Sequence, residues 1–515
     1  MKTSAPSMIG CLLLGTVTAW PSPADAPGAR RGRVIYNLDC SEFFVGTFGP
    51  PVPETIDAFV DAHAAAGVTD LFINVNAQCT NYRSHVWDAQ WDGYDPKAGD
   101  DQPFFAAIDP KRRSGPEASE ADMYKNLLAL HESGCDYPKR MLDRTRHNNV
   151  KAWLSLRMND AHNPDKPDYP SHSTFWRSHP QWHLRNGPNP AQGSWSTGGL
   201  DYEQPEVRAY YMNLIEEVCA RYDLDGLELD FLRFDLYFRP GRQHEGARLM
   251  TAFVEEARAV TRRAEKRLGH PVKLAVRVPT TPWIARMRGL DAVAWAKAAL
   301  VDLIVASPFW DSADSDVPVE TWKGLLIGTK VAVVVCQEDG INSGASGRRT
   351  MNPEETRGVL LSGLHRGADG VYFFNLFTNP YQSWPRETYY QMLRDAASRE
   401  ALAKLPRRHP ITIKSPWAPG ESMPSRQLPY TGTHRVFRIH IGPKPLPAQQ
   451  ARVELAVPSH HEPLDVRLNG VPCTPAQNRS HVYDIPPGTA SNGYNLVEVN
   501  SAKDTKIDWV EISVQ

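Results

Sequence analysis

The clearest chemical signal in the chain is residues 222–233, where acidic and bulky apolar residues alternate. Side chains of a β-strand point alternately to opposite faces, so Glu228 and Asp230 would share one face while their apolar neighbours pack on the other. Two carboxylates on one rigid face are suited to acid, base or nucleophilic chemistry. The alternative is a buried ion-pair network neutralised by Arg or Lys. We favour the functional interpretation.

Eight short apolar segments resemble the buried parallel strands of an α/β protein. They cover residues 34–40, 70–76, 151–159, 226–233, 273–280, 302–310, 330–339 and 370–377. Helix-like segments between them cover 54–66, 121–148, 206–222, 246–268, 290–300 and 353–366. Strands that each lead into a helix predict an α/β fold, a (β/α)8 TIM barrel, over residues 31–405.

Polar residues fall late in these strands, at the end where TIM barrels place their active sites. They are Asn37, Asp39, Asn74, Asn76, Ser155, Arg157, Asn159, Glu228, Asp230, Arg277, Ser307, Trp310, Gln337, Glu338 and Asn375. Any one of them alone is better explained as a satisfied interior residue. Unpaired buried polar groups are costly, however, so the whole set predicts one shared solvated site. On the seventh strand, Gln337 and Glu338 compete for the inward position.

Hydrolysis of a glycosidic bond needs one carboxylic acid to protonate the leaving oxygen and a second carboxylate as nucleophile or base. We predict that the catalytic carboxylates are Asp230, Glu228 and Glu338, with Asp311, Asp39 and Asp339 as alternatives. The predicted substrate-binding residues are Asp39, Asn76, Arg157, Asn159, Arg277, Trp310 and Asn375. Arginines near the acids would lower carboxylate pKa values, or could bind an acidic sugar.

We predict neither a cofactor nor a metal site, because the histidines and scattered cysteines lack metal-ligand spacing. The net charge of −2 offers no broad basic surface for nucleic acid. The expected partner is therefore a carbohydrate.

Two long insertions, residues 77–120 and 161–204, are rich in aromatic residues. Loops of this length usually form lids or binding walls. Their rings either offer flat faces to sugar C–H groups or fasten the loops to the barrel.

The two ends of the chain differ in character from the barrel. The apolar run of residues 8–19 is too short to span a membrane. Because Lys2 precedes it, the run predicts a signal peptide, with a linker, over residues 1–30. The protein would then be secreted or periplasmic. Residues 406–515 alternate apolar with polar residues at period two between turn sequences such as Asn469-Gly470, which predicts a β-sandwich. This sandwich either binds sugar or buttresses the barrel, and its few aromatic residues favour the buttress.

Residues 200–208 and 222–231 together resemble the bacterial glycosyl hydrolase-like proteins labelled family-ten-like. The resemblance implies a secreted TIM-barrel hydrolase acting on a polysaccharide, and it places Asp230 at the second Asp of the strand motif. Many members carry a paired Asp where this chain has Phe231-Leu232-Arg233, so the second carboxylate would come from Glu228 or another strand. The same strand segment also matches part of a chitinase-like acidic pattern, but Leu232 stands where that pattern has its terminal Glu. This departure disfavours catalysis assisted by an N-acetyl group.

Two other classes of function stay open from the sequence. A non-catalytic glycan-binding barrel would keep the aromatic cleft without needing the acids. A barrel enzyme of another class would be a metal-dependent hydrolase or a lyase.

Overall fold

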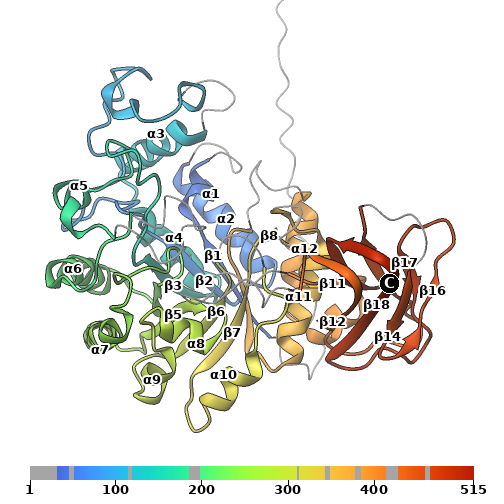
Figure 1. Ribbon diagram of the computed structural model, residues 1–515. Coiled ribbons are helices and arrows are strands. Elements are labelled where there is room, and N and C mark those ends of the chain that lie inside the picture. The colour runs from blue at the N-terminus through green and yellow to red at the C-terminus, as the bar shows by residue number, and fades with distance from the viewer. Residues whose placement is uncertain are drawn as a thin grey trace, which may run out of the picture. The chain divides into compact units, whose positions relative to one another are not determined.

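The computed structural model describes residues 32–45, 51–113, 119–184, 198–309, 313–342, 348–376, 384–412, 427–458 and 464–515. Gly32–Gln515 forms one compact unit. Within it, eight parallel strands close into a barrel in the order β1-β10-β7-β6-β5-β4-β3-β2 (Figure 1). These strands are β1 (Arg33–Leu38), β2 (Asp70–Asn74), β3 (Lys151–Arg157), β4 (Gly226–Asp230), β5 (Lys273–Pro279), β6 (Leu303–Ser307), β7 (Ala332–Gln337) and β10 (Gly370–Phe373). The predicted TIM barrel is confirmed.

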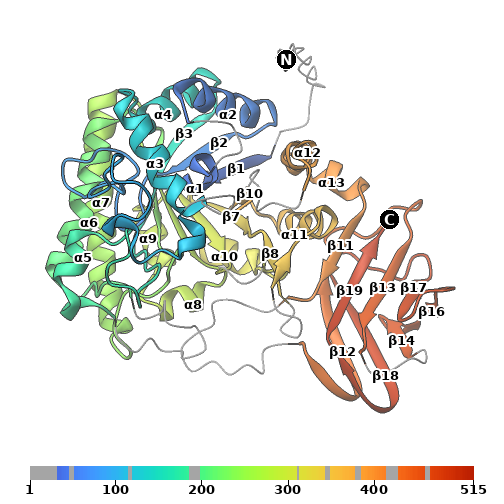
Figure 2. The same cartoon turned by 90° about the horizontal axis from the view of Figure 1, so that it is seen from above.

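Helices surround the strands (Figure 2). They are α1 (Cys40–Phe44), α2 (Pro53–Ala65), α3 (Ser119–Glu132), α4 (Tyr137–His147), α5 (Thr174–Ser178), α6 (Pro205–Arg221), α7 (Gln243–Leu268), α8 (Pro282–Met287), α9 (Ala292–Lys297), α10 (Val319–Leu325), α11 (Pro353–His365), α12 (Arg386–Ala396) and α13 (Arg399–Lys404). None of the described helices is both long and apolar enough to cross a bilayer.

The single helix predicted over 121–148 is wrong, because the chain forms α3 and α4 there. Gly134 adopts a φ of 82°, which ends the first helix. Asp136 then caps α4 by accepting a hydrogen bond from the Lys139 backbone N–H, and Pro138 lies in the first turn.

The strands separate two apolar clusters, one outside and one inside the barrel. Leu227, Leu229 and Phe231 of the β4 segment belong to the large outer cluster beneath the helices. The inner cluster includes Trp153 and Cys336. The predicted phase of the β4 segment is therefore correct, and Glu228 and Asp230 point inward. Glu338, just past the end of β7, contacts Asn375 and lies near Arg277, whereas the Gln337 side chain lies against Met351, so Glu338 takes the inward position.

The C-terminal part is all β, as predicted. One sheet has the order β11-β19-β13-β17-β16 and the other β12-β18-β14-β15. The strands are β11 (Arg407–Pro410), β12 (Tyr430–His440), β13 (Ala451–Ala456), β14 (Asp465–Leu468), β15 (Val471–Pro472), β16 (Thr474–Pro475), β17 (Val482–Asp484), β18 (Tyr494–Ile507) and β19 (Trp509–Val514). A separate two-stranded hairpin, β8 (Gly340–Ile341) and β9 (Arg349–Thr350), follows β7.

Gly226, the first residue of β4, lies against the ring of Trp153, and a Cβ at this position would lie 2.3 Å from ring atoms. The ring cannot easily move, because it stacks on Phe72 at 4.6 Å and its Nε1 donates to Asp70. We expect Gly226→Ala to lower the free energy of unfolding by about 1–3 kcal/mol through overpacking, measured by urea denaturation. Gly324→Ala is the control, because nothing lies within 4 Å of its added Cβ. Equal stability of Gly226→Ala and the parent would contradict this packing.

Candidate active site

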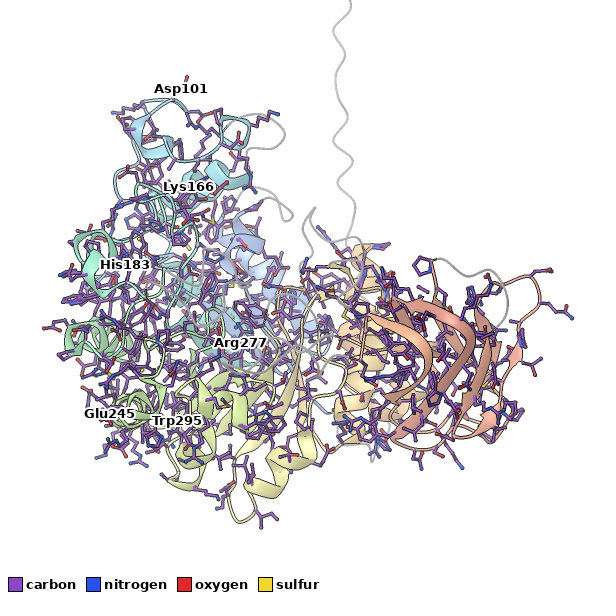
Figure 3. All side chains as sticks on the ribbon, viewed as in Figure 1. Asp101, Lys166, His183, Glu245, Arg277 and Trp295 are labelled. Carbon is purple, nitrogen blue, oxygen red and sulfur yellow. The ribbon has the colours of Figure 1, made fainter. Side chains whose placement is uncertain are left out.

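A row of three charged residues crosses the carboxyl end of the barrel. Arg157 of β3, Asp230 of β4 and Arg277 of β5 are register partners on adjacent strands. Arg277 donates from Nε to Asp230 Oδ1 at 2.8 Å and from Nη2 to Oδ2 at 3.0 Å. Both side chains are about fully buried, each with 1% of its surface exposed, and Figure 3 shows Arg277 among the barrel strands.

Asp230 accepts two further hydrogen bonds, both at Oδ1. The backbone N–H groups of Leu232 and Arg233 lie 2.9 and 3.0 Å from Oδ1. These four donors stabilise the carboxylate anion. Oδ1 is then saturated, whereas Oδ2 accepts only the Arg277 bond among the described residues and keeps a lone pair for chemistry.

Arg277 makes several contacts with protein groups. In addition to the two bonds with Asp230, Arg277 donates from Nη1 to Ser307 Oγ at 3.0 Å. Its guanidinium lies 3.8 Å from the ring centroid of Phe374. Arg277 therefore holds Asp230, and its contact with sugar hydroxyls stays a prediction.

Glu338 follows β7 and has a very different environment from Asp230. It is 1% exposed, and among the described residues its carboxylate accepts a hydrogen bond only from Asn375 Nδ2, at 3.3 Å. Burial raises the pKa of Glu338 to about 8, with Asp339 acting in the same direction and Arg277 and Arg233 opposing it. Glu338 is thus a protonated acid at neutral pH.

Phe374 and Asn375 join the two carboxyl groups into one cluster. Phe374 stacks on the guanidinium that holds Asp230, and the next residue, Asn375, contacts Glu338. Asn375 has a φ of 55°, a left-handed conformation that Asn tolerates better than most residues. The turn after β10 therefore contacts both the guanidinium that holds Asp230 and the carboxyl group of Glu338.

Glu228 lies one row deeper, paired in register with Ser155 of β3. Its carboxylate accepts hydrogen bonds from Ser155 Oγ at 2.6 Å, from Asn37 Nδ2 at 3.2 Å and from the Tyr372 hydroxyl at 2.8 Å. It has no exposed surface, and burial, together with the charge of Asp230, raises its pKa. Glu228 therefore lies on the floor of the site, and its catalytic role stays a prediction.

A second charged cluster surrounds Arg157. Its Nη2 donates to Asp39, and its Nη1 lies 3.4 Å from Asp160 Oδ2. Burial alone would raise the pKa of Asp39, but the charges of Arg157 and Arg233 outweigh it and hold the pKa at about 2. Asp39 and Arg157 thus reach the mouth as an ion pair, and their contact with a sugar stays a prediction.

His162 connects this cluster to Arg233. Its Nδ1 lies 2.6 Å from Asp160 Oδ1, and Arg233 Nη2 lies 2.8 Å from its Nε2. An arginine nitrogen only donates, so Nε2 accepts and Nδ1 carries the proton toward Asp160. The cluster fixes the Arg233 side chain immediately beyond Asp230.

Asn76 and Asn159 do not point hydrogen-bonding groups at a ligand. The Asn76 amide bonds with the backbone of Ala77 and Arg157, and the Asn159 amide bonds with the backbone of Leu200 and Leu236. Both amides therefore hold loop backbone, and their contact with a sugar stays a prediction. Trp310, predicted to bind substrate, and the alternative acid Asp311 lie outside the described residues.

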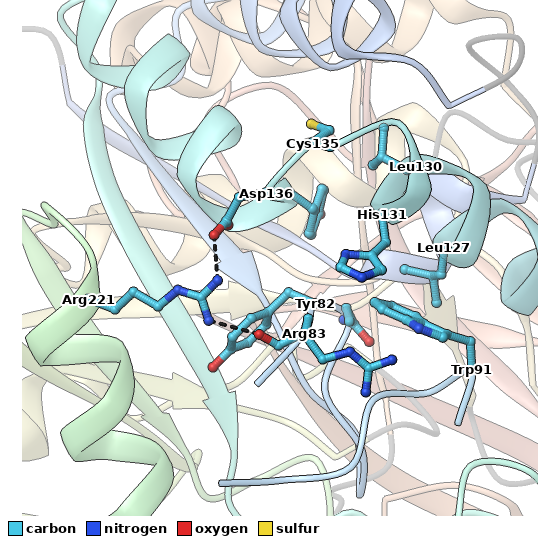
Figure 4. Close-up of a pocket in the computed structure, with 12 residues that line it drawn as sticks. Tyr82, Arg83, Trp91, Leu127, Leu130, His131, Cys135, Asp136 and Arg221 are labelled. Atoms are coloured by element: carbon cyan, nitrogen blue, oxygen red, sulfur yellow. Dashed lines mark hydrogen bonds and ion pairs between the residues drawn. The ribbon is translucent and has the colours of Figure 1, made fainter. Parts of the chain in front are cut away.

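The described aromatic residues of the two insertions largely stack on protein groups. Phe175 and Trp87 lie on either side of Tyr210, with centroid distances of 3.9 and 4.2 Å. Trp91 stacks on His131 beside a cavity of about 140 Å³ (Figure 4). The rings described here thus fasten the loops to the barrel, as the second of the two interpretations holds.

The described ranges also bear on metal binding. They contain no group of three or more His, Cys, Asp or Glu side chains arranged to hold a metal ion. The cysteines described there are free thiols, namely Cys79, Cys135, Cys219, Cys336 and Cys473.

Several site residues were missed by sequence reasoning. Tyr372 and Phe374 read as members of an apolar strand, although alternation places both inward. Asp160 and His162 follow the polar end of β3, and their spacing from Arg157 could have indicated a shared cluster. Their pairing could not be predicted, because it depends on the path of the loop after the strand.

The chain matches no known protein family and no curated protein. Among solved structures it resembles an α-galactosidase of Geobacillus stearothermophilus in complex with stachyose, with 12% identity, 94% of this chain and 55% of that chain covered, and a TM-score of 0.38. It also resembles an α-L-fucosidase isoenzyme of Paenibacillus thiaminolyticus, with 11% identity, 73% of this chain and 51% of that chain covered, and a TM-score of 0.42. A third similar structure is a maltogenic α-amylase of Thermotoga neapolitana, with 11% identity, 92% of this chain and 98% of that chain covered, and a TM-score of 0.38. The chain spans about half the length of the first two proteins. TM-scores this low assign no activity to it.

The burial of Glu228 predicts a pH-dependent cost to stability. Its pKa is raised in the folded state, so the folded protein binds this proton more tightly than the unfolded chain does. The free energy of unfolding is then lost as pH rises from the ordinary Glu pKa through the folded one. Between about pH 5 and about pH 8, we expect the free energy of unfolding of Glu228→Gln to fall by a few kcal/mol less than that of the parent protein. Urea denaturation at both pH values measures it, and an unchanged difference would contradict the assignment.

Proposed function

We propose that the protein is a glycoside hydrolase in which Glu338 is the general acid and Asp230 the nucleophile or base. The observation that carries this proposal is the contrast between the environments of two carboxyl groups at the carboxyl end of the barrel. Asp230 accepts four hydrogen bonds, two of them from a guanidinium. Burial keeps Glu338 protonated. Environments that separate two acids in this way assign the acid and base roles.

The reaction follows from these charge states. Glu338 donates its proton to the glycosidic oxygen as the bond to the anomeric carbon breaks. Asp230 Oδ2, the oxygen with the spare lone pair, either attacks that carbon or takes a proton from the attacking water. Arg277 holds the carboxylate in one orientation, so little reorganisation is needed during the reaction. The resemblance to the family-ten-like proteins left open whether the second carboxylate comes from another strand. In the proposed reaction it is Glu338, from the segment after β7.

The substrate proposed is a polysaccharide or oligosaccharide outside the cytoplasm. Export is proposed from Lys2 and the apolar residues 8–19. The buried ion pairs near the acids are well balanced, since Arg157, Arg233 and Arg277 face Asp39, Asp160 and Asp230. That balance favours a neutral sugar at the site over an anionic one.

Asp230→Asn and Glu338→Gln are each expected to lower kcat/KM by at least two orders of magnitude on natural polysaccharide. Release of new reducing ends from a panel of plant, algal and bacterial polysaccharides measures this. Asp143→Asn and Glu400→Gln, at surface sites whose side chains are 55% and 69% exposed, are the matched controls. Circular dichroism confirms the fold of each variant.

The outcomes separate the alternative functions. Sugar binding without turnover in the parent protein would identify a glycan-binding barrel. Products that absorb in the ultraviolet would identify a lyase, and loss of activity to chelator a metal-dependent hydrolase. Full activity of both variants would refute the proposed roles.

The pH profile gives an independent test of the acid. Activity requires protonated Glu338, so it should fall as pH rises through about 8, the pKa that burial gives this group. In Glu338→Gln this alkaline limb should disappear from the residual activity. An aryl glycoside with a leaving group that needs no protonation should restore most of the rate of Glu338→Gln but not that of Asp230→Asn. Equal restoration of both variants would contradict the assignment of Glu338.

A further inference from the structure

We infer that the C-terminal sandwich positions the acid Glu338, and that Trp509 is the residue through which it does so. The inference rests on the proposed role of Glu338. It follows from a continuous set of contacts that begins at the acid, passes through the β8–β9 hairpin and ends on β19. Figure 2 shows β8 on the side of the barrel that faces β19.

Glu338 lies at the base of the β8–β9 hairpin. The next residue, Asp339, accepts a hydrogen bond from the Met351 backbone N–H at 2.8 Å, which closes the hairpin. The Gln337 side chain donates to the Glu338 carbonyl and lies 3.8 Å from the Met351 sulfur. The Trp384 indole donates to the Met351 carbonyl at 2.9 Å. The backbone of the acid is thus tied to Met351.

Met351 belongs to a small apolar cluster that the sandwich completes. The buried members are Ala313, Ile341, Met351 and Val359, and Trp509 of β19 packs against them. Trp509 also lies beneath the Arg349 guanidinium, 4.9 Å from ring centroid to Cζ. Arg349 in turn forms two hydrogen bonds with Glu355 of α11, at 2.9 and 2.5 Å. The ring therefore contacts Arg349 of β9 and packs against the apolar cluster to which Ile341 of β8 belongs.

The sandwich holds the Trp509 ring from its own side. Trp509 Nε1 donates to Glu511 Oε2 at 3.0 Å. Arg408 of β11 donates from Nε to Glu511 Oε1 at 2.7 Å. Glu511 has no exposed surface. A ring fixed by a buried carboxylate is a rigid surface for the hairpin to pack on.

Loss of this surface should change the acid in a specific way. The raised pKa of Glu338 comes mainly from burial. The charged groups that face it are Asp339, Arg277, Arg233 and Arg348. If the hairpin moves, water reaches the carboxyl group and the pKa falls toward the ordinary value. A purely structural defect would lower the amount of folded enzyme without moving the pH profile.

The test compares Trp509→Ala with Trp509→Phe and with Leu496→Ala, a sandwich position that is 47% exposed. For Trp509→Ala we expect kcat to fall about tenfold with little change in KM, and the alkaline limb to move down by about one pH unit. Trp509→Phe should restore most of both, and Leu496→Ala should match the parent. An alkaline limb that stays in place in Trp509→Ala would overturn the inference.

Hydrogen exchange tests the same coupling without any substrate. Peptides covering residues 337–342 and 348–352 should exchange faster in Trp509→Ala than in Leu496→Ala, because the Met351 N–H bond to Asp339 opens more often. Ile341→Ala, made on the barrel side of the same contact, should add little to the effect of Trp509→Ala. Unchanged exchange would overturn the inference even if Glu338→Gln is inactive. Faster exchange with a fully active Glu338→Gln would instead refute the proposed function and leave the coupling in place.

Discussion

The compensation of buried charge at the carboxyl end of the barrel is the constraint on which the site depends. Arg157, Asp230 and Arg277 stand side by side on three adjacent strands, and both the aspartate and its guanidinium partner are almost without contact to solvent. Ions removed from water are stable only with close opposite charges and further hydrogen bonds. Each ion of the row has both, so the strands can carry charges where a barrel core would otherwise require apolar residues.

The same constraint sorts the three inward carboxyl groups by depth and partner. Asp230 has a guanidinium and two backbone donors, which hold it as an anion. Glu228, one row deeper, has neutral side-chain donors alone among the described residues, from Asn37, Ser155 and Tyr372. Glu338 has one amide. The number and charge of these donors therefore fall from Asp230 to Glu338, and the proposed division into a base and an acid rests on this gradient.

Strand alternation made the barrel and the inward face of β4 predictable, because a period of two allows only one of two phases. It could not identify the partner of each charge. Arg277 was expected to bind sugar, yet its register beside Asp230 gives it a nearer acceptor. Asn76 and Asn159 were expected in the site because they share that phase, but both lie beyond the last residue of their strands, where the backbone leaves amide and carbonyl groups to be satisfied. Loop paths, which no local pattern specifies, decided these cases and the stacking of the insertion rings.

The two acids also differ in what holds their backbone. Asp230 is the last residue of β4, with neighbouring strands on both sides, so the barrel itself fixes its position. Glu338 lies one residue beyond β7, where the strand pairing has ended. Its position then depends on the hairpin that follows, and a two-stranded hairpin of such short strands is not stable alone. Packing against Trp509 and α11 supplies the missing support. If Glu338 is the acid of the proposed reaction, its burial then depends on a domain outside the barrel, and the sandwich contributes to the chemistry through the hairpin.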